Sequence, residues 1–375
     1  MLESVNRVLV SRSALAHNFG LCRRQVPSAA VMAMVKADAY GHGMLECARV
    51  FADCGAEAFG VAEVVEGVQL RQAGFVQPVF ILAGVLPDFF DALFEYDLTP
   101  ILVDGEFVSP LAVKAASLGK RINVHLKVDA GMGRQGCLLS DAPEIVGRIA
   151  NQKYLHLAGI MAHFPKADDP ASGSSERILS DFLKMTTGLG LETARGFSLH
   201  IANSGGIFSV SGSGLDMVRP GISLYGYPAG GAGSGKGTAA EQLQPAMSFT
   251  SRVIQARVVP AGTGLGYGHT FITKRTTRLA VLPVGYEDGY LRSLGDSAQV
   301  LLHGRRAPVV GRISMNLTLV DVTELGDVRS GDEAVLLGRQ GKESITADEI
   351  ADWMRTISYE VLCLLGHCNR IVYTD

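Results

Sequence analysis

The first 226 residues alternate between short apolar runs and longer amphipathic segments. Eight of the apolar runs have the length and composition of buried strands. They span residues 31–36, 58–62, 78–84, 98–103, 122–129, 156–164, 197–204 and 216–226. Most of the intervening segments have a helical period, and glycine follows several of them as a C-cap. Eight strand–helix repeats predict a (β/α)8 barrel of the TIM type, with an open doubly wound sheet as the alternative.

The pattern changes after a glycine-rich stretch at residues 228–242. Beyond it, apolar runs punctuated by turn residues predict a mostly-β domain. One helix interrupts these strands: Thr346 and Glu349 form a T-x-x-E capping box, and we expect Gly366 to end the helix. We therefore predict an α/β chain with a barrel over residues 1–228, a linker over 229–242 and a β-domain over 243–375.

The linker contains GGAGSGKGT (230–238), which is similar to a phosphate-binding loop. Such a loop needs a helix that begins at its Lys-Thr pair, and Pro245 interrupts the short segment that follows. We interpret the stretch as a flexible linker.

Composition narrows the class of protein. The chain has 375 residues, of which 47% are hydrophobic and 19% charged, so it has enough apolar material for a folded core. Its net charge of −3 provides no basic stripe, which argues against nucleic-acid binding. It lacks both a signal-peptide core and an apolar run of membrane-spanning length, so we expect a cytoplasmic protein without membrane contact. The six cysteines lack CxxC spacing and suit reduced, mostly buried thiols.

Lys36 ends the first predicted strand and is followed closely by Tyr40 and His42. This position is the carboxyl mouth of a barrel, where such folds carry their active sites. Burial lowers the pKa of a lysine and makes its amine nucleophilic, as a Schiff base requires. Taken alone, Lys36 is better explained as a lysine that extends to the barrel rim, and only the other strand ends favour the Schiff-base role.

Other strand ends carry polar residues at the same predicted face. These are Lys127, Arg134, His163, Asn203, Ser204 and Arg219. The backbone amides near Ser204, Gly221 and Ile222 occupy the place where barrels commonly bind phosphate. Each residue alone is explained by a helix cap or a surface ion pair. Together, a phosphate site and a nucleophilic lysine indicate pyridoxal phosphate.

The order and spacing of these motifs resemble those of alanine racemases, a family of fold-type III pyridoxal-phosphate enzymes, over essentially the whole chain. The motifs are VKADAYGHG, HLKVDAGMGR, ANS, RPGISLYG, GYGHTF, GYEDGY, GRISMN and SYEVLC. The resemblance implies that Lys36 forms the Schiff base and that Arg219 faces the pyridine nitrogen. It implies cofactor contacts from Tyr40, Leu82, Arg134, His163, Asn203, Ser204, Gly221, Ile222 and Tyr359. By the same resemblance, Lys127 is a candidate for carbamylation that steadies Arg134.

Racemisation needs two bases on opposite faces of the substrate Cα atom. Lys36 is one, and the resemblance assigns the other to Tyr267 of the partner subunit, which implies a homodimer with shared active sites. Because a guanidinium stays protonated, Arg219 makes the cofactor ring a weaker electron sink than a carboxylate does. A weaker sink favours rapid return of the proton over transamination.

The resemblance also concerns the substrate. It implies that Arg134, Met315 and Asn316 bind a small amino acid and that Tyr286 and Arg292 line the corridor leading to it. Alanine racemases commonly carry aspartate where this chain has Asn316, so racemisation of serine or basic amino acids stays open beside L- and D-alanine. We identify no metal-ligating set.

Three other activities share parts of this pattern. A fold-type III decarboxylase typically has a catalytic cysteine motif and a GGG phosphate loop, neither of which we find. A noncatalytic pyridoxal-phosphate carrier lacks the β-domain that residues 243–375 predict. A sugar or phosphate enzyme on a plain barrel does not bind this cofactor, and fold alone does not separate these activities.

Overall fold

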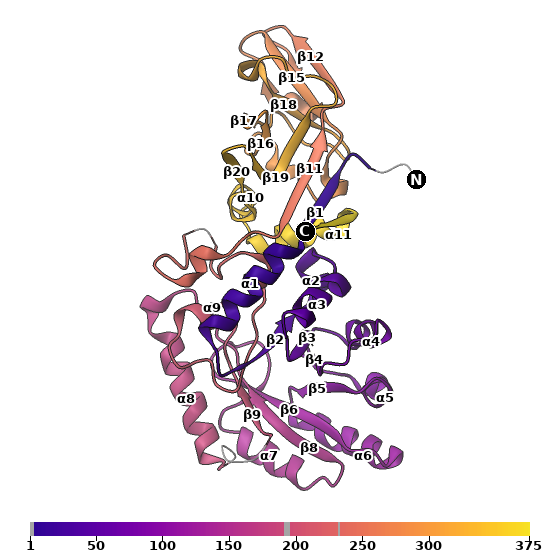
Figure 1. The fold of residues 1–375 in the computed structure, drawn as a ribbon, viewed down its shortest axis with the longest axis vertical. Helices are drawn as coiled ribbons and strands as arrows, with labels where there is room; N and C mark the ends of the chain where they lie inside the picture. Colours follow the sequence, from indigo (N-terminus) through magenta and orange to yellow (C-terminus); the bar gives the residue numbers. More distant parts are fainter. Residues whose placement is uncertain (1–3, 191–195, 232) are drawn as a thin grey trace. The chain divides into compact units, whose positions relative to one another are not determined.

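A computed structural model describes residues 4–190, 196–231 and 233–375 (Figure 1). The described chain forms two compact units. The barrel unit comprises residues 16–39 and 44–243, and the β unit comprises the residues up to Leu15, residues 40–43 and residues 244–375. Among the described residues, no helix has both the length and the apolar character needed to cross a membrane.

Eight parallel strands form the barrel unit. They are β2 (Ala30–Met34), β3 (Ala58–Val61), β4 (Val79–Ile81), β5 (Leu98–Leu102), β6 (Ile122–Asp129), β8 (Leu155–Met161), β9 (Ser198–His200) and β10 (Met217–Val218). Pairing runs in the order β10-β2-β3-β4-β5-β6-β8-β9, and the short β7 (Cys137–Leu138) pairs with the end of β6. The amide of Arg219 donates to the Ala202 carbonyl at 2.9 Å, which joins the last two strands. The predicted barrel is confirmed, with its eight strands in the expected order.

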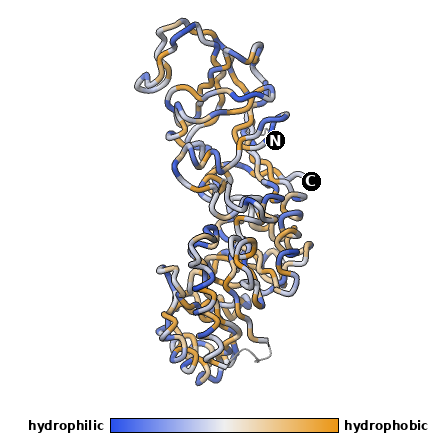
Figure 2. The backbone as a smooth tube through the Cα atoms, turned by 90° about the vertical axis from the view of Figure 1, so that its left-hand side faces the viewer, coloured by the Kyte–Doolittle hydropathy of each residue, from blue (hydrophilic) through white to orange (hydrophobic). Residues whose placement is uncertain are grey.

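Helices cover the outside of these strands (Figure 1). The α-helices are α1 (Arg12–Gln25), α2 (Lys36–Gly41), α3 (Met44–Asp53), α4 (Val64–Gln72), α5 (Phe90–Glu95), α6 (Val108–Leu118), α7 (Ala142–Ala150), α8 (Ser174–Gly188) and α9 (Ser204–Ser209). Short 3-10 turns are η1 (Pro87–Phe89), η2 (Gly105–Phe107), η3 (Pro170–Ser172), η4 (Ile222–Tyr225) and η5 (Ala239–Gln242). Hydrophobic and hydrophilic stretches alternate along the chain (Figure 2), as expected when each helix buries one face against a buried strand.

The described residues of the β unit form three sheets. The largest contains β1 (Arg7–Ser11), β11 (Met247–Arg252), β16 (Gln299–Leu302), β17 (Arg305–Pro308), β19 (Glu333–Gln340), β20 (Glu343–Ile345) and β21 (Ile371–Thr374). The others are β12 (Gln255–Val259) with β15 (Thr277–Leu282) and β18 (Thr318–Asp321), and β13 (Gly264–Leu265) with β14 (Phe271–Ile272). Its 3-10 turns are η6 (Tyr267–His269), η7 (Tyr286–Asp288), η8 (Arg292–Leu294) and η9 (Thr323–Leu325).

The first strand belongs to the β unit, although the sequence assigns residues 1–228 to the barrel. β1 pairs with β11 in antiparallel and with β21 in parallel orientation. Val8 and Val10, which point to the same face of β1, are fully buried there. The apolar face of β1 is therefore buried by strands from later in the chain. The hydrophobic pattern of residues 7–11 does not show which sheet the strand joins, because a strand of the barrel and a strand of the β unit are both buried.

The helix predicted after Thr346 is two helices, α10 (Ala347–Met354) and α11 (Ser358–Cys368). Thr346 caps α10 as predicted, with its hydroxyl accepting from the Glu349 amide at 3.1 Å. Arg355 has a φ of +59° and ends α10. The prediction that Gly366 ends the helix is wrong, because this glycine lies inside α11. A Cβ atom there would lie 1.8 Å from the Gly41 carbonyl oxygen, so close backbone packing requires the glycine.

The GGAGSGKGT stretch ends in η5 rather than in an α-helix. Thr238 caps this four-residue turn by accepting from the Ala240 amide at 3.2 Å. The helix that a phosphate-binding loop requires after its Lys-Thr pair does not form in the described residues of this stretch.

Candidate active site

Lys36 lies two residues after the end of β2 and begins an unusual turn. Residues 37 to 40 all have φ between +51° and +55°, so α2 winds in the left-handed sense without any glycine at those four positions. Contacts on both sides hold the turn: the Ala37 amide donates to Glu66 at 2.6 Å, and Asp38 accepts from the Met44 amide at 2.7 Å. Strained backbone of this kind persists only where surrounding contacts fix it, and it is concentrated at functional sites.

Four cationic residues of the barrel unit act on one another electrostatically. We call Lys36, Lys127, Arg134 and Arg219 the cation cluster. Burial, together with the charges of the other three, lowers the pKa of Lys127 to about 8. Asp129 is the one carboxylate among these influences. Such an excess of positive charge favours the binding of an anion.

Lys127 also contacts Gln135, which the sequence analysis did not single out. Its amine donates to the Gln135 carbonyl oxygen at 2.8 Å, and the Gln135 amide donates to the Ala83 carbonyl at 2.7 Å. The second bond fixes the side-chain amide so that its oxygen faces Lys127.

Arg219 is 3% exposed and lies in a row of histidines. Its Nη1 donates to His200 Nδ1 at 2.9 Å, and His200 Nε2 lies 2.8 Å from His125 Nδ1. Its Nη2 donates to the Ala162 carbonyl at 2.6 Å and lies 3.3 Å from His163 Nδ1. These contacts of the described residues use both terminal nitrogens and leave Nε available to a ligand.

The histidines around Arg219 are neutral near pH 7. Burial lowers the pKa of His125 to about 3, with Arg219 and His156 adding to the effect. Burial and the Arg219 charge also hold the pKa values of His163 and His200 well below the ordinary value. Because Arg219 is a donor only, His200 accepts at Nδ1 and therefore donates from Nε2 to His125. Burial lowers the pKa of Arg219 to about 9, which keeps it protonated at pH 7.

Ser204 joins the ends of two barrel strands. Its hydroxyl accepts from the Gly221 amide at 2.9 Å and from the Ser223 amide at 3.2 Å. Next to it, Asn203 caps α9 by accepting from the Gly206 amide at 3.0 Å, and its Nδ2 lies 3.3 Å from His163 Nε2. The buried Ser223 hydroxyl has no hydrogen-bond partner. We call Ser204, Gly221, Ile222 and Ser223 the serine cradle.

The remaining predicted residues divide between the units. Leu82 follows β4 in the barrel unit, where its amide donates to the Val61 carbonyl at 2.9 Å. Tyr40 and Tyr359 belong to the β unit, and their ring centroids lie 6.0 Å apart. Burial, with the neighbouring Tyr359 and Cys363, raises the pKa of Tyr40 well above its ordinary value.

Tyr267, Tyr286, Met315 and Leu317 are exposed side chains of the β unit, and we call them together the tyrosine face. Their exposed fractions are 66%, 39%, 52% and 44%. Two hydrogen bonds connect the segment of Tyr286 and Arg292 with the segment of Met315: the Tyr286 amide donates to the Ser314 carbonyl at 3.2 Å, and Arg292 donates to the Ile313 carbonyl at 3.4 Å. The structure therefore joins Tyr286 and Arg292 to the later segment that contains Met315.

The sequence analysis did not single out His200 and Gln135, which contact the candidate residues Arg219 and Lys127, or His125, which contacts His200. His125 and Lys127 share one face of β6, since alternate residues of a strand point the same way. A polar residue two positions from a candidate lysine in a buried strand was the available signal for His125. His200, in the buried strand β9, carried a similar signal.

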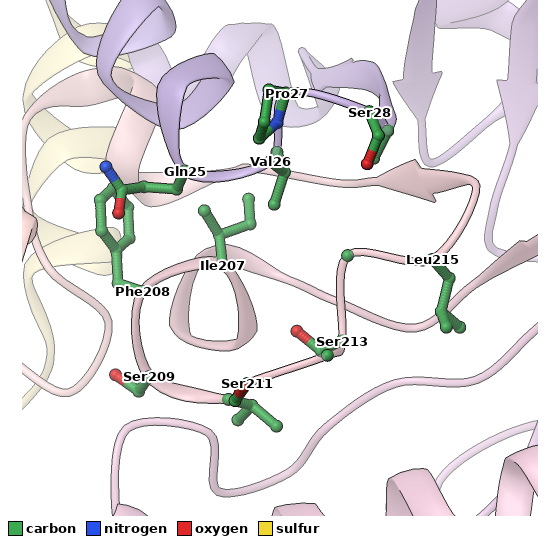
Figure 3. Close-up of a pocket in the computed structure, with 14 residues that line it drawn as sticks. Gln25, Val26, Pro27, Ser28, Ile207, Phe208, Ser209, Ser211, Ser213 and Leu215 are labelled. Carbon is green, nitrogen blue, oxygen red and sulfur yellow. The ribbon is translucent and has the colours of Figure 1, made fainter.

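A cavity of about 550 Å³ lies elsewhere in the barrel unit (Figure 3). Residues 25–29 and 207–215 line it, directly before β2 and β10 begin. The candidate site residues follow the strands, so this cavity lies at the opposite, amino-terminal ends of the strands. None of the predicted site residues lines it.

The sequence matches two family profiles in the order that this architecture requires. Residues 10–229 match the alanine racemase N-terminal domain, and residues 246–373 match the alanine racemase C-terminal domain. The chain belongs to the alanine racemase family. Its resemblance to that family is confirmed, and a carrier without the β-domain is excluded by the second match.

Known relatives agree over nearly the full length of the chain. An alanine racemase from Syntrophobacter fumaroxidans is 39% identical over 366 residues, which cover 97% of this chain and 96% of the relative. The crystal structure of alanine racemase from a D-cycloserine-producing Streptomyces lavendulae has a TM-score of 0.93 at 31% identity, covering 100% and 98% of the two chains. Membership in this family makes the chain an amino-acid isomerase, and the activity that the family supports is alanine racemisation.

One similar structure contains a cofactor. Alanine racemase from Bartonella henselae, solved with covalently bound pyridoxal phosphate, has a TM-score of 0.88 at 26% identity. The alignment covers 99% of this chain and 100% of the Bartonella henselae chain. The use of pyridoxal phosphate is a property of the family.

Proposed function

We propose that this chain interconverts L-alanine and D-alanine with pyridoxal phosphate, using Lys36 and Tyr267 of the partner subunit as opposed bases. The observation that carries the proposal is the cation cluster at the strand ends of the barrel unit, where burial and the neighbouring charges lower the pKa of Lys127 to about 8. The cofactor phosphate and the substrate carboxylate are both anions that such a cluster suits.

The residues of the barrel unit fit the cofactor. The unpartnered Ser223 hydroxyl offers a donor for a phosphate group, and the Ser204 hydroxyl, which accepts from the Gly221 and Ser223 amides, keeps its own proton to donate. Arg219 retains its Nε for the pyridine nitrogen. Lys36 attaches the cofactor, and the residues that hold it are Tyr40, Leu82, Arg134, His163, Asn203, Ser204, Arg219, Gly221, Ile222 and Tyr359.

The chain's own groups carry the proton. When bound, the cofactor supplies the electron-withdrawing system that makes the substrate Cα proton acidic. Lys36 and the partner's Tyr267 then act on opposite faces of Cα: one removes the proton and the other donates one. In the reverse direction they exchange roles, so both substrates use the same pair.

Arg219 keeps this exchange from becoming transamination. Its guanidinium stays protonated, so it donates to the pyridine nitrogen without transferring a full proton. The neutral His200 accepts from Arg219 and keeps its plane fixed. Arg219 would thereby leave more of the negative charge at the substrate Cα, where Lys36 or the partner's Tyr267 returns a proton.

Lys127 steadies Arg134 as a carbamate. Its lowered pKa provides the neutral amine, whose nitrogen would form a bond to the carbon of carbon dioxide and release one proton to solvent, which leaves a negative charge within the cation cluster. The Gln135 oxygen accepts equally from the amine or from the carbamate N–H, so it suits both forms.

The test is to incubate the protein with pyridoxal phosphate and L-alanine in deuterium oxide and to follow D-alanine and Cα deuteration. D-alanine deuterated at Cα supports the proposal. Cα deuteration without any D-enantiomer contradicts the second base, because proton removal then occurs on one face only.

A further inference from the structure

Glu287 is an exposed residue whose surroundings combine two loops of the tyrosine face. Its amide donates to the Met315 carbonyl at 3.1 Å, next to the bond between Tyr286 and Ser314. The two segments touch so closely that a Cβ atom on Gly285 would lie 2.2 Å from the carbonyl oxygens of both Ser314 and Met315. The backbone around Glu287 therefore has a fixed position relative to Met315.

The Glu287 side chain is fixed as well. Asn316 donates from its Nδ2 to Glu287 Oε2. The neighbouring Asp288 carboxylate is engaged elsewhere, because it accepts from the Gly285 amide at 2.9 Å and from Asn6 at 3.0 Å. Of the two acidic residues in η7, Glu287 is thus the one that presents its carboxylate beside the predicted substrate-binding pair Met315 and Asn316.

This arrangement changes the meaning of Asn316. The sequence alone indicates that asparagine removes a negative charge from the substrate side-chain region. In the structure, the asparagine amide orients a different carboxylate, that of Glu287. A negative charge is therefore still present beside Met315, but Glu287 carries it instead of an aspartate at position 316.

We propose that the Glu287–Asn316 pair makes serine a substrate of this enzyme beside alanine. The inference rests on the proposed function, because it requires the tyrosine face to enter the active site of the partner subunit. There, the Glu287 carboxylate accepts a hydrogen bond from the serine hydroxyl. A buried hydroxyl that lacks a hydrogen-bond acceptor destabilises the complex. A pocket that supplies an acceptor therefore binds serine better than a purely apolar pocket does.

The same charges argue against basic amino acids. A lysine or arginine side chain brings a second positive charge toward the guanidinium groups of Arg134 and Arg219. Arg292, which contacts the same segment, adds a further positive charge. The single Glu287 carboxylate does not offset the repulsion from all of these cations. A neutral side chain that donates one hydrogen bond fits both the acceptor and the cation cluster.

The test compares kcat/KM for L-serine and L-alanine in the holoenzyme. Glu287→Ala is expected to lower kcat/KM for serine by about 10- to 100-fold, the effect of losing one hydrogen bond to a charged group, and to change that for alanine by less than about threefold. Glu287→Gln keeps an acceptor oxygen and is expected to retain part of the serine activity. Asn316→Ala, which releases Glu287, is expected to lower serine activity less than Glu287→Ala does.

Glu324→Gln is the matched control. Glu324 is also an exposed carboxylate of the β unit, paired with Arg275 at 2.6 Å, and β18 separates it in the chain from the tyrosine face. This variant is expected to leave both substrates unchanged. Parallel losses for serine and alanine in Glu287→Ala, or no loss for serine, overturn the proposal.

The wild-type enzyme separates this inference from the proposed function. Racemisation of alanine without detectable racemisation of serine overturns the role of Glu287 and leaves the proposed function intact. Failure to racemise either amino acid in the presence of pyridoxal phosphate contradicts the proposed function itself.

Discussion

At the scale of single residues, the barrel interior is held by neutral histidines around one permanent cation. Because Arg219 is a donor only, the hydrogen bonds run in one direction: Arg219 donates to His200, and His200 donates to His125. A protonated imidazole in this row would face the arginine charge in a buried site. The row therefore positions Arg219 at neutral pH and becomes costly when the solution is acidified.

Acid is expected to destabilise the barrel through these histidines. In the unfolded chain they take up protons near pH 6.5, whereas the folded pKa of His125 is about 3. Between these values the unfolded state binds more protons, so the free energy of unfolding falls as the pH falls. Between pH 6.5 and pH 5, the free energy of unfolding of His125→Gln is expected to fall by up to about 2 kcal/mol less than that of wild type, as measured by urea unfolding.

The control is His367→Gln, which replaces an exposed histidine of α11. It is expected to leave the pH dependence of wild type. A His125→Gln protein with the same acid sensitivity as wild type contradicts the neutral, buried state of His125.

At the scale of elements, the left-handed turn of α2 positions the residues that follow Lys36. Four consecutive residues with positive φ carry a steric cost that glycine avoids. Bonds from Glu66 and Asp38 hold the turn in place. The turn is thus stabilised by its neighbours rather than by its own sequence.

Ala37→Gly is expected to stabilise the protein by about 0.5 to 1 kcal/mol. Ala37 is exposed with φ of +53°, so glycine relieves strain without leaving a cavity, and part of the gain is lost to unfolded-state entropy. The matched control is Ala116→Gly in the right-handed helix α6, which is expected to cost about 1 kcal/mol. Denaturant midpoints measure both changes, and destabilisation by both variants contradicts the strain argument.

At the scale of the whole molecule, the proposed bases lie in different units of the chain. Lys36 belongs to the barrel unit, and the exposed Tyr267 belongs to the β unit. The proposed dimer brings a Tyr267 loop to each barrel from the other subunit. Neither subunit then carries a complete site of its own.

Hybrid dimers test this sharing. Lys36→Ala and Tyr267→Ala proteins are each expected to be inactive, but a hybrid has one site with both bases intact. Unfolding and refolding an equal mixture is expected to recover about a quarter of wild-type activity, since half of the dimers are hybrids and each has one of two sites. Mixing Lys36→Ala with Arg219→Ala places both defects in the barrel and is expected to give no such recovery. An inactive Lys36/Tyr267 mixture that forms dimers contradicts a shared site.

The sequence alone determined the barrel, its eight strands and the cluster of polar strand ends. Periodicity and strand-end chemistry are local properties, so residues such as Lys36, Lys127 and Ser204 were found from their place in a pattern. The same local reasoning failed at Gly366, where the need for glycine comes from the Gly41 backbone packed against it. It also gave no indication that β1 completes the sheet of the β unit.

Only the tertiary structure decided which side chains act on one another across the chain. His125 meets His200 from a position 75 residues away, and Asn316 meets Glu287 across 29 residues. Such contacts depend on strand order and loop packing, which a linear pattern does not specify. For the same reason the sequence identified Asn316 as a missing charge, whereas the fold identifies the carboxylate that it orients.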